Sequence, residues 1–188
     1  MSSHHIVREK QEPALLILNL DQFDQEYLGQ LLEWSPTIIV SGPVYEKADS
    51  LGIKIDVVIT SDPGFSPQES TLIIPAGDTL LEDALKFLVG EQYPSVNIIT
   101  SEFALKDYAM YVDRIDLVIY MGDKKIFPVR SGFSKWCAAG ENVLLLQEVN
   151  NLHTSGLQLI NHHTLQTEKD GFYTLTFDHS FIFIAETI

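Results

Sequence analysis

The 188-residue chain has little of several features that would decide its class. It has one cysteine, Cys137, so no internal disulfide can form, and a lone thiol fits a reducing compartment. No apolar run approaches the roughly 20 residues that a membrane-spanning helix needs. The first residues lack the hydrophobic stretch of a secretory signal. These absences predict a cytoplasmic protein that does not span a membrane.

Basic residues are also scarce. The chain has 12 Lys and Arg against 26 Asp and Glu, which gives a formal net charge of −14. Nucleic-acid binding depends mainly on Lys and Arg contacts to phosphates, so this charge predicts that nucleic acid is not a partner. The same field repels a bare nucleotide, which would need a divalent cation and a local set of backbone N–H groups to bind.

The familiar catalytic and metal-binding motifs are missing. The sequence contains no GxxxxGK[ST] or GxGxxG phosphate loop, no CxxC, no HExxH and no serine-elbow pattern. His162 and His163 are adjacent, and neighbours on a strand point to opposite faces, so they are poor joint metal ligands. Cys137 is interpreted as a small buried hydrophobic residue.

The first half of the chain alternates apolar runs with helical patterns. Such alternation predicts crossover connections and a mainly parallel sheet in an α/β domain. The predicted strands span residues 14–20, 37–42, 55–62, 70–77 and 95–100, and the predicted helices span residues 24–34, 44–52 and 79–89.

The second half shows only short strand patterns. Apolar runs flank Gly122 and Asp123, which indicates a hairpin, and further runs follow at 142–149, 155–160, 172–177 and 180–185. No helical pattern of useful length follows Tyr111, so this half is predicted to be an all-β sandwich. We therefore divide the chain into a flexible N-terminus (1–13), an α/β domain (14–114) and a β-sandwich domain (115–188).

Polar residues follow several predicted parallel strands, at the edge where open α/β sheets bind ligands. One strand ends in Ser41 and Gly42, another ends in Asp62, and a third leads into Asp78 and Thr79. Carboxylates gathered there can hold Mg²⁺ against a triphosphate. The alternative is structural, with an Asp-Pro-Gly turn at Asp62 and a helix cap at Asp78 or Thr79.

Read together, these segments resemble the thiamin pyrophosphokinase family. Residues 37–64 have the family layout of a strand ending in a DGG-type motif, a helix, and a strand leading into GDFDS. The helix start at 79–84 resembles the family's TD(L/T)E-x-A pattern. Residues 153–157 and 170–184 resemble the T-x-GL strand and the last hairpin. The likeness covers residues 14–188.

The resemblance implies a site and a reaction. Asp62 corresponds to the first Asp of GDFDS, Gly42 to the first glycine of DGG, and Asp107 to the acidic residue of a reduced GGRLDH segment. It implies catalytic roles for Asp62 and Asp107, metal binding by Asp62 and Asp78, and nucleotide contacts from Ser41, Gly42, Asp78 and Thr79. The family reaction needs ATP and Mg²⁺ and converts thiamin to thiamin pyrophosphate with release of AMP. Family members also pair through their β domains, which implies a homodimer.

Several family carboxylates are replaced in this sequence. Ser41 stands at the Asp of DGG, Gly64 at the second Asp of GDFDS, and Leu80 at the Asp of TD. Phosphoryl transfer depends on positioning and charge neutralisation, so these losses predict weak or absent turnover. Two hypotheses follow: a divergent thiamin pyrophosphokinase, or a non-catalytic relative that binds thiamin or another small molecule or serves regulation.

Overall fold

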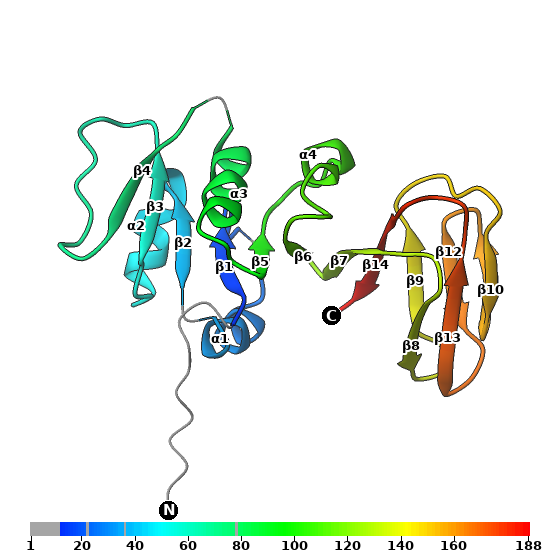
Figure 1. The fold of residues 1–188 in the computed structure, drawn as a ribbon. Helices are drawn as coiled ribbons and strands as arrows, with labels where there is room; N and C mark the ends of the chain where they lie inside the picture. The colour runs from blue at the N-terminus through cyan, green and yellow to red at the C-terminus, as the bar shows by residue number, and fades with distance from the viewer. Residues whose placement is uncertain (1–11, 22, 36, 78) are drawn as a thin grey trace, which may run out of the picture. The chain divides into compact units, whose positions relative to one another are not determined.

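The computed structural model describes residues 12–21, 23–35, 37–77 and 79–188. The chain divides into two compact units, Met1–Leu117 and Val118–Ile188, each described by itself below (Figure 1). The prediction of a flexible segment at 1–13 falls mostly outside the described residues. The domain assignment 14–114 and 115–188 stays a prediction.

The first unit contains a parallel sheet of five strands in the order β5-β1-β2-β3-β4. This arrangement confirms the parallel sheet predicted for the first half. Its strands are β1 (Ala14–Ile17), β2 (Ile38–Ser41), β3 (Val57–Thr60), β4 (Leu72–Pro75) and β5 (Ser95–Ile99). Its helices are α1 (Gln25–Glu33), α2 (Gly42–Ser50), α3 (Leu80–Gly90) and α4 (Leu105–Ala109).

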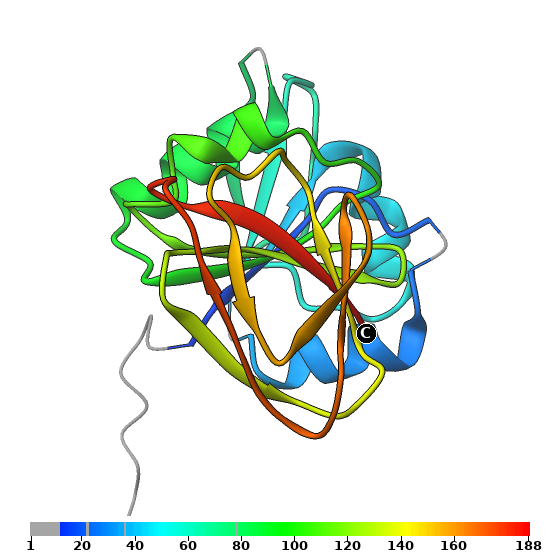
Figure 2. The ribbon, with the colours of Figure 1, turned by 90° about the vertical axis from the view of Figure 1, so that its right-hand side faces the viewer.

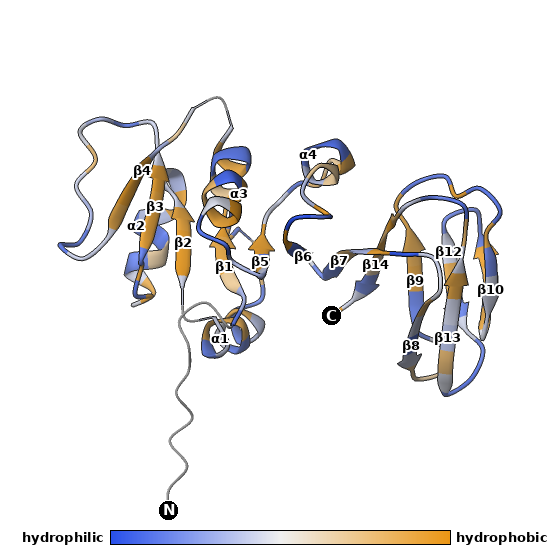
Figure 3. Ribbon diagram, in the orientation of Figure 1, coloured by the Kyte–Doolittle hydropathy of each residue, from blue (hydrophilic) through white to orange (hydrophobic). Residues whose placement is uncertain are grey.

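The inner strands of this sheet are buried along their whole length. Every residue of β1, β2 and β3 is buried, which accounts for their continuous apolar sequences (Figure 3). Helix α1 begins after Asp24, whose Oδ1 accepts a hydrogen bond from the Tyr27 N–H at 2.7 Å. Helix α3 packs its apolar stripe of Ala84, Leu85 and Leu88 into the core.

Helix α2 begins earlier than its sequence pattern predicted. The helix starts at Gly42, directly after β2, with Ser41 as its N-cap residue and Pro43 in its first turn. Pro43 fits there because the first N–H groups of a helix have no partner within it. Ser41 and Gly42 are therefore part of a direct strand-to-helix junction rather than a loop.

The second unit is built from strands alone. Strand β6 (Asp116–Met121) carries the chain into it and pairs with β7 (Lys124–Val129) across a tight turn, where Gly122 has a φ of 60°. The other strands are β8 (Phe133–Cys137), β9 (Asn142–Leu145), β10 (His153–Ser155), β11 (Leu157–Asn161), β12 (Thr164–Thr167), β13 (Gly171–Thr176) and β14 (Ile182–Thr187). No helix occurs among the described residues after Tyr111, in agreement with the sequence pattern.

Two sheets of this unit share one hydrophobic core. The first contains β11-β12-β9-β14-β7-β6, and the second contains β10-β13-β8. Val143, Leu165 and Ile184 from the first sheet pack in one cluster with Tyr173 and Leu175 from the second. Figure 2 shows the later strands of this unit, from β9 to β14, drawn from yellow to red. Strands of both sheets therefore contribute to one core, and the β-sandwich domain stays a prediction.

No helix in the described parts of the chain is long and apolar enough to cross a bilayer.

Candidate functional site

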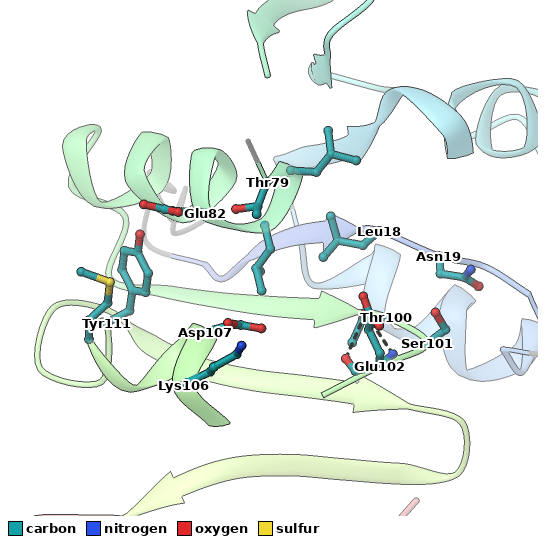
Figure 4. A pocket seen from close by; sticks show the side chains of 13 residues that line it. Leu18, Asn19, Thr79, Glu82, Thr100, Ser101, Glu102, Lys106, Asp107 and Tyr111 are labelled. Carbon is teal, nitrogen blue, oxygen red and sulfur yellow. Dashed lines mark hydrogen bonds between the residues drawn. The ribbon is translucent and has the colours of Figure 1, made fainter. Parts of the chain in front are cut away.

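The carboxyl ends of the parallel strands carry two adjoining pockets in the first unit. Residues that follow β1 and β5 line the first, together with α3 and α4, and we call it the α3–α4 pocket (Figure 4). Residues at the start of α2 and after β3 and β4 line the second, which we call the α2–β3 pocket. Each has a volume of about 440 Å³, and Leu80 lines both. The edge of the sheet that was predicted to bind ligands therefore carries pockets, at the positions of several polar residues that the sequence analysis singled out.

The Ser41 side chain has a structural role in the junction between β2 and α2. It is 1% exposed, and its hydroxyl donates to the Leu18 carbonyl oxygen at 3.3 Å. It makes no capping hydrogen bond to the described residues of α2. Ser41 does not line either pocket among the residues described, whereas Gly42 lines the α2–β3 pocket.

Asp62 lines the α2–β3 pocket and forms a turn. Its Oδ1 accepts a hydrogen bond from the Gly64 N–H at 2.8 Å, and the Phe65 N–H reaches the Asp62 carbonyl at 3.3 Å. The Asp-Pro-Gly turn that the sequence suggested is therefore present. The side chain is exposed, so the same carboxylate also faces the pocket and solvent.

Thr79 lies at the start of α3 and lines the α3–α4 pocket. It is the N-cap residue of α3, yet its hydroxyl makes no capping bond within the described chain. Asp83 instead reaches back from the first turn, where its Oδ2 accepts from the Gly77 N–H at 2.7 Å. Asp78, predicted as a metal and nucleotide ligand, lies outside the described residues.

Asp107 belongs to the short helix α4 and lines the α3–α4 pocket with Lys106. Glu102 lines the same pocket from the segment after β5, where its N–H donates to Thr100 Oγ1 at 3.4 Å (Figure 4). Asp62 and Asp107, the two predicted catalytic carboxylates, thus line different pockets, which share Leu80.

Sequence reasoning missed several residues of this site. Asn19, Glu102 and Tyr111 line the α3–α4 pocket without belonging to any motif that was singled out. Asn19 could have been found because it directly follows the first buried strand, at the ligand-binding edge. Nothing in the sequence singles out Tyr111, because its place in the pocket depends on how the chain folds around it.

No group of three or more His, Cys, Asp or Glu side chains within the described ranges converges to hold a metal ion. A single carboxylate, Asp62, faces the α2–β3 pocket among these residues. Mg²⁺ at nucleotide sites commonly uses one or two carboxylates, with phosphate oxygens and water as the remaining ligands. Asp62 therefore supplies one carboxylate, the smallest number that such a site commonly uses.

Comparison with known proteins gives a match in structure but not in sequence. No protein-family model matches the chain, and no curated protein matches it either. Among solved structures, thiamine pyrophosphokinase from Bacillus subtilis is similar, with a TM-score of 0.68 and 13% identity over 93% of this chain and 98% of that one. The thiamin pyrophosphokinase from Geobacillus thermodenitrificans has a TM-score of 0.69 and 10% identity over 93% and 97% of the two chains.

A structure from a fungus gives the same result. Thiamin pyrophosphokinase from Candida albicans matches with a TM-score of 0.67 and 10% identity over 94% of this chain and 90% of that chain. The similarity covers nearly the whole of each partner, so both units of this chain take part in it. The chain therefore has the fold of the thiamin pyrophosphokinases.

Proposed function

We propose that this chain is a divergent thiamin pyrophosphokinase that transfers pyrophosphate from ATP to thiamin at a low rate. The observation that carries the proposal is the pair of pockets that adjoin at Leu80, on the ligand-binding edge of a sheet with the thiamin pyrophosphokinase fold. In this reaction the thiamin hydroxyl attacks the β-phosphorus of ATP, and AMP leaves. Two adjoining pockets suit a reaction that brings two small molecules together.

The α2–β3 pocket suits the polyphosphate. It lies at the first turn of the nine-residue helix α2, whose amino end carries partial positive charge. Gly42 and the polar residue Ser61 both line it. Asp62 would supply a carboxylate to Mg²⁺, which neutralises phosphate charge when it is bound. Asp78 stays part of the proposed ligand set from its position in the sequence.

The α3–α4 pocket suits the second reactant or the remainder of the nucleotide. Asp107 and Thr79 line it, so both residues would act on the molecule bound in this pocket. Asp107 would have its predicted catalytic role there, and Thr79 its predicted nucleotide-binding role. Asp107 can accept a hydrogen bond from a hydroxyl or an amino group, which would orient the bound molecule.

The placement of the carboxylates in two pockets is the basis for the low rate that we propose. Asp62 faces one pocket and Asp107 the other, while Ser41 is buried against Leu18 and offers no charge. Every 1.36 kcal/mol of lost transition-state stabilisation lowers the rate about tenfold, so a single missing metal ligand has a large effect. We expect the site to bind substrates better than it turns them over.

The test is release of AMP from ATP in the presence of Mg²⁺ and thiamin. We expect turnover far below about one per second, the lower end of ordinary enzymes. Asp62→Ala should reduce it further, whereas Asp123→Ala, a matched change in the exposed turn between β6 and β7, should leave it unchanged. An equal rate for the Asp62→Ala variant and the unaltered chain would contradict the proposal. Complete absence of AMP release would favour the non-catalytic hypothesis.

We also propose that the protein works as a homodimer in the cytoplasm. The single cysteine and the family resemblance support this arrangement.

A further inference from the structure

A third pocket lies at the opposite edge of the parallel sheet from the two pockets described above. Residues at the end of α1, at the start of β2 and between α2 and β3 line it, and we call it the amino-edge pocket. In Figure 1, α1 lies near the tails of the strands of this unit, away from their arrowheads. The amino-edge pocket has a volume of about 320 Å³ and shares no described residue with the α3–α4 pocket or the α2–β3 pocket. A molecule bound there is therefore separate from the proposed substrates.

Two helix ends and a turn form the amino-edge pocket. Helix α1 ends just before Ser35. Helix α2 ends at its C-cap residue Leu51, and Gly52 then adopts a φ of 73°, which turns the chain toward β3. Asp56 ties the end of this turn to the start of β2, because its Oδ2 accepts a hydrogen bond from the Ile38 N–H at 2.9 Å. The walls of the pocket are thus held in place by the fold.

Two opposite charges lie side by side in the lining. Lys54 Nζ is 3.4 Å from Asp56 Oδ1, and the lysine side chain is 81% exposed. An exposed ion pair of this kind contributes little stability, so a ligand can replace it at little cost. The two groups complement a molecule that itself carries a positive and a negative group close together. Such a molecule has no net charge, so it also avoids the repulsion that an anion meets from a chain with a net charge of −14.

Apolar side chains form much of the remaining lining. They belong to Leu32, Ile38, Leu51 and Ile53, and Leu51 is 46% exposed. Covering that leucine with an aliphatic group removes apolar surface from water, which favours binding. The volume of about 320 Å³ is at the low end for ligand pockets, so the aliphatic group has to be small.

Ser35 adds a polar group that the described chain leaves unpaired. The residue is 4% exposed, and its Oγ has no hydrogen-bond partner among the described residues. Buried polar groups are nearly always paired, so this hydroxyl is an exception. Rotation about one side-chain bond redirects a serine hydroxyl, which can then donate to a carboxylate or accept from an ammonium group. A ligand with both charged groups offers either partner.

We propose that the amino-edge pocket binds a small aliphatic α-amino acid. The carboxylate of the amino acid pairs with Lys54, its ammonium group pairs with Asp56, and its side chain packs against Leu51 and Ile53. Both charged groups of an α-amino acid are attached to one carbon atom, so their short separation matches that of the Lys54 and Asp56 charges. The Ser35 hydroxyl bonds to one of the two charged groups.

The experiment is a titration of the full chain with L-leucine, followed by the NMR shifts of the protein's Leu and Ile methyl groups. Two analogues separate the charges, because 4-methylpentanoate lacks the ammonium group and 3-methylbutylamine lacks the carboxylate. We expect L-leucine to shift the signals of Ile38, Leu51 and Ile53 with a Kd on the order of a millimolar, and both analogues to bind several-fold more weakly. Signals of Leu18 and Leu81, which line the α3–α4 pocket, should not move.

Three variants test the named residues. Lys54→Met should weaken L-leucine by about three- to fivefold, the size of one surface ion pair, and should not weaken 3-methylbutylamine, which has no carboxylate. Lys86→Met is the matched control and should leave binding unchanged, because Lys86 forms a comparable exposed ion pair with Glu82 outside this pocket. Ser35→Ala should weaken L-leucine without lowering the unfolding temperature, since the hydroxyl that it removes has no partner in the described chain.

Three results would overturn the proposal. They are the absence of a saturable shift at the pocket with L-leucine, an analogue that binds as tightly as L-leucine, and L-leucine binding that is unchanged in both Lys54→Met and Ser35→Ala. Tight binding of 4-methylpentanoate would assign the pocket to anions instead. None of these measurements uses ATP or thiamin, so they are interpretable whatever the assay for AMP release gives.

Discussion

Gly42 and Thr60 are so close that no side chain fits between them. A Cβ atom placed on Gly42 would lie 2.7 Å from Thr60 Oγ1 and 2.9 Å from Thr60 Cβ. The same Thr60 Oγ1 accepts a hydrogen bond from the Asp62 N–H at 3.2 Å. The start of α2 is therefore coupled through Thr60 to the turn that holds Asp62. Gly42 is required for this packing, whatever it also contributes to phosphate binding.

Gly42→Ala should destabilise the fold by about 1–3 kcal/mol, because the added methyl group overpacks the junction. Urea unfolding measures the change. Gly29→Ala is the matched control, since Gly29 is an exposed position of α1 and nothing lies within 4 Å of the added Cβ. That control should stabilise by about 0.5–1 kcal/mol through helix propensity. Equal effects of the two substitutions would contradict the close approach of Gly42 and Thr60.

Glu186 joins two side chains inside the second unit. It is 9% exposed, accepts from the Tyr173 hydroxyl, and forms an ion pair with Lys135 Nζ. Glu186→Ala leaves both partners without their acceptor, so we expect a loss of about 2–4 kcal/mol of unfolding free energy. Glu148→Ala, a change at an exposed carboxylate in the same unit, should cost less than about 0.5 kcal/mol. A loss of less than about 1 kcal/mol for Glu186→Ala would contradict a stabilising role for this network.

Stability should fall in alkaline solution because of buried tyrosines. Burial raises the pKa of both Tyr108 and Tyr173 above the ordinary value of 10.0, and the charge of Glu186 adds to the rise at Tyr173. Above about pH 10 the unfolded chain loses these protons while the folded chain retains them, so the folded state binds more protons. The unfolding free energy should therefore be unaffected by these groups below about pH 10 and decline above it.

Urea unfolding from about pH 8 to about pH 11 tests this expectation. The decline should be shallower in Tyr173→Phe, which lacks one of the tyrosines whose pKa burial raises. A slope that is identical in this variant would show that Tyr173 ionises normally in the folded chain.

An exposed aromatic pair leads to a prediction about assembly. Phe172 and Trp136 are opposite each other on β13 and β8, and they are 70% and 55% exposed. Such a pair on an otherwise polar strand face is typical of a contact surface. We expect light scattering to report twice the chain mass of 21.2 kDa, and Phe172→Lys to shift the protein toward the monomer. A monomer for the unaltered chain at concentrations on the order of tens of micromolar would contradict the predicted homodimer.

The sequence predicted the elements better than the site. Buried strands such as Ile38–Ser41 show as continuous apolar runs, and the acidic start at Asp24 marked the beginning of α1. The start of α2 was misplaced because Gly and Pro are typical of loops, while here Pro43 occupies the first helical turn. The burial of Tyr111, whose hydroxyl has no partner among the described residues, could not be predicted, since it depends on which side chains surround residue 111 in space.

A crystal structure with a non-hydrolysable ATP analogue, Mg²⁺ and thiamin is the most direct test of the proposed substrate site. We expect ligand density in the two pockets that adjoin at Leu80, with phosphates in the α2–β3 pocket beside Asp62 and the second reactant or the remainder of the nucleotide in the α3–α4 pocket. Density for both ligands elsewhere, or none at this edge of the sheet at saturating concentrations, would contradict the proposal that this chain works as a divergent thiamin pyrophosphokinase.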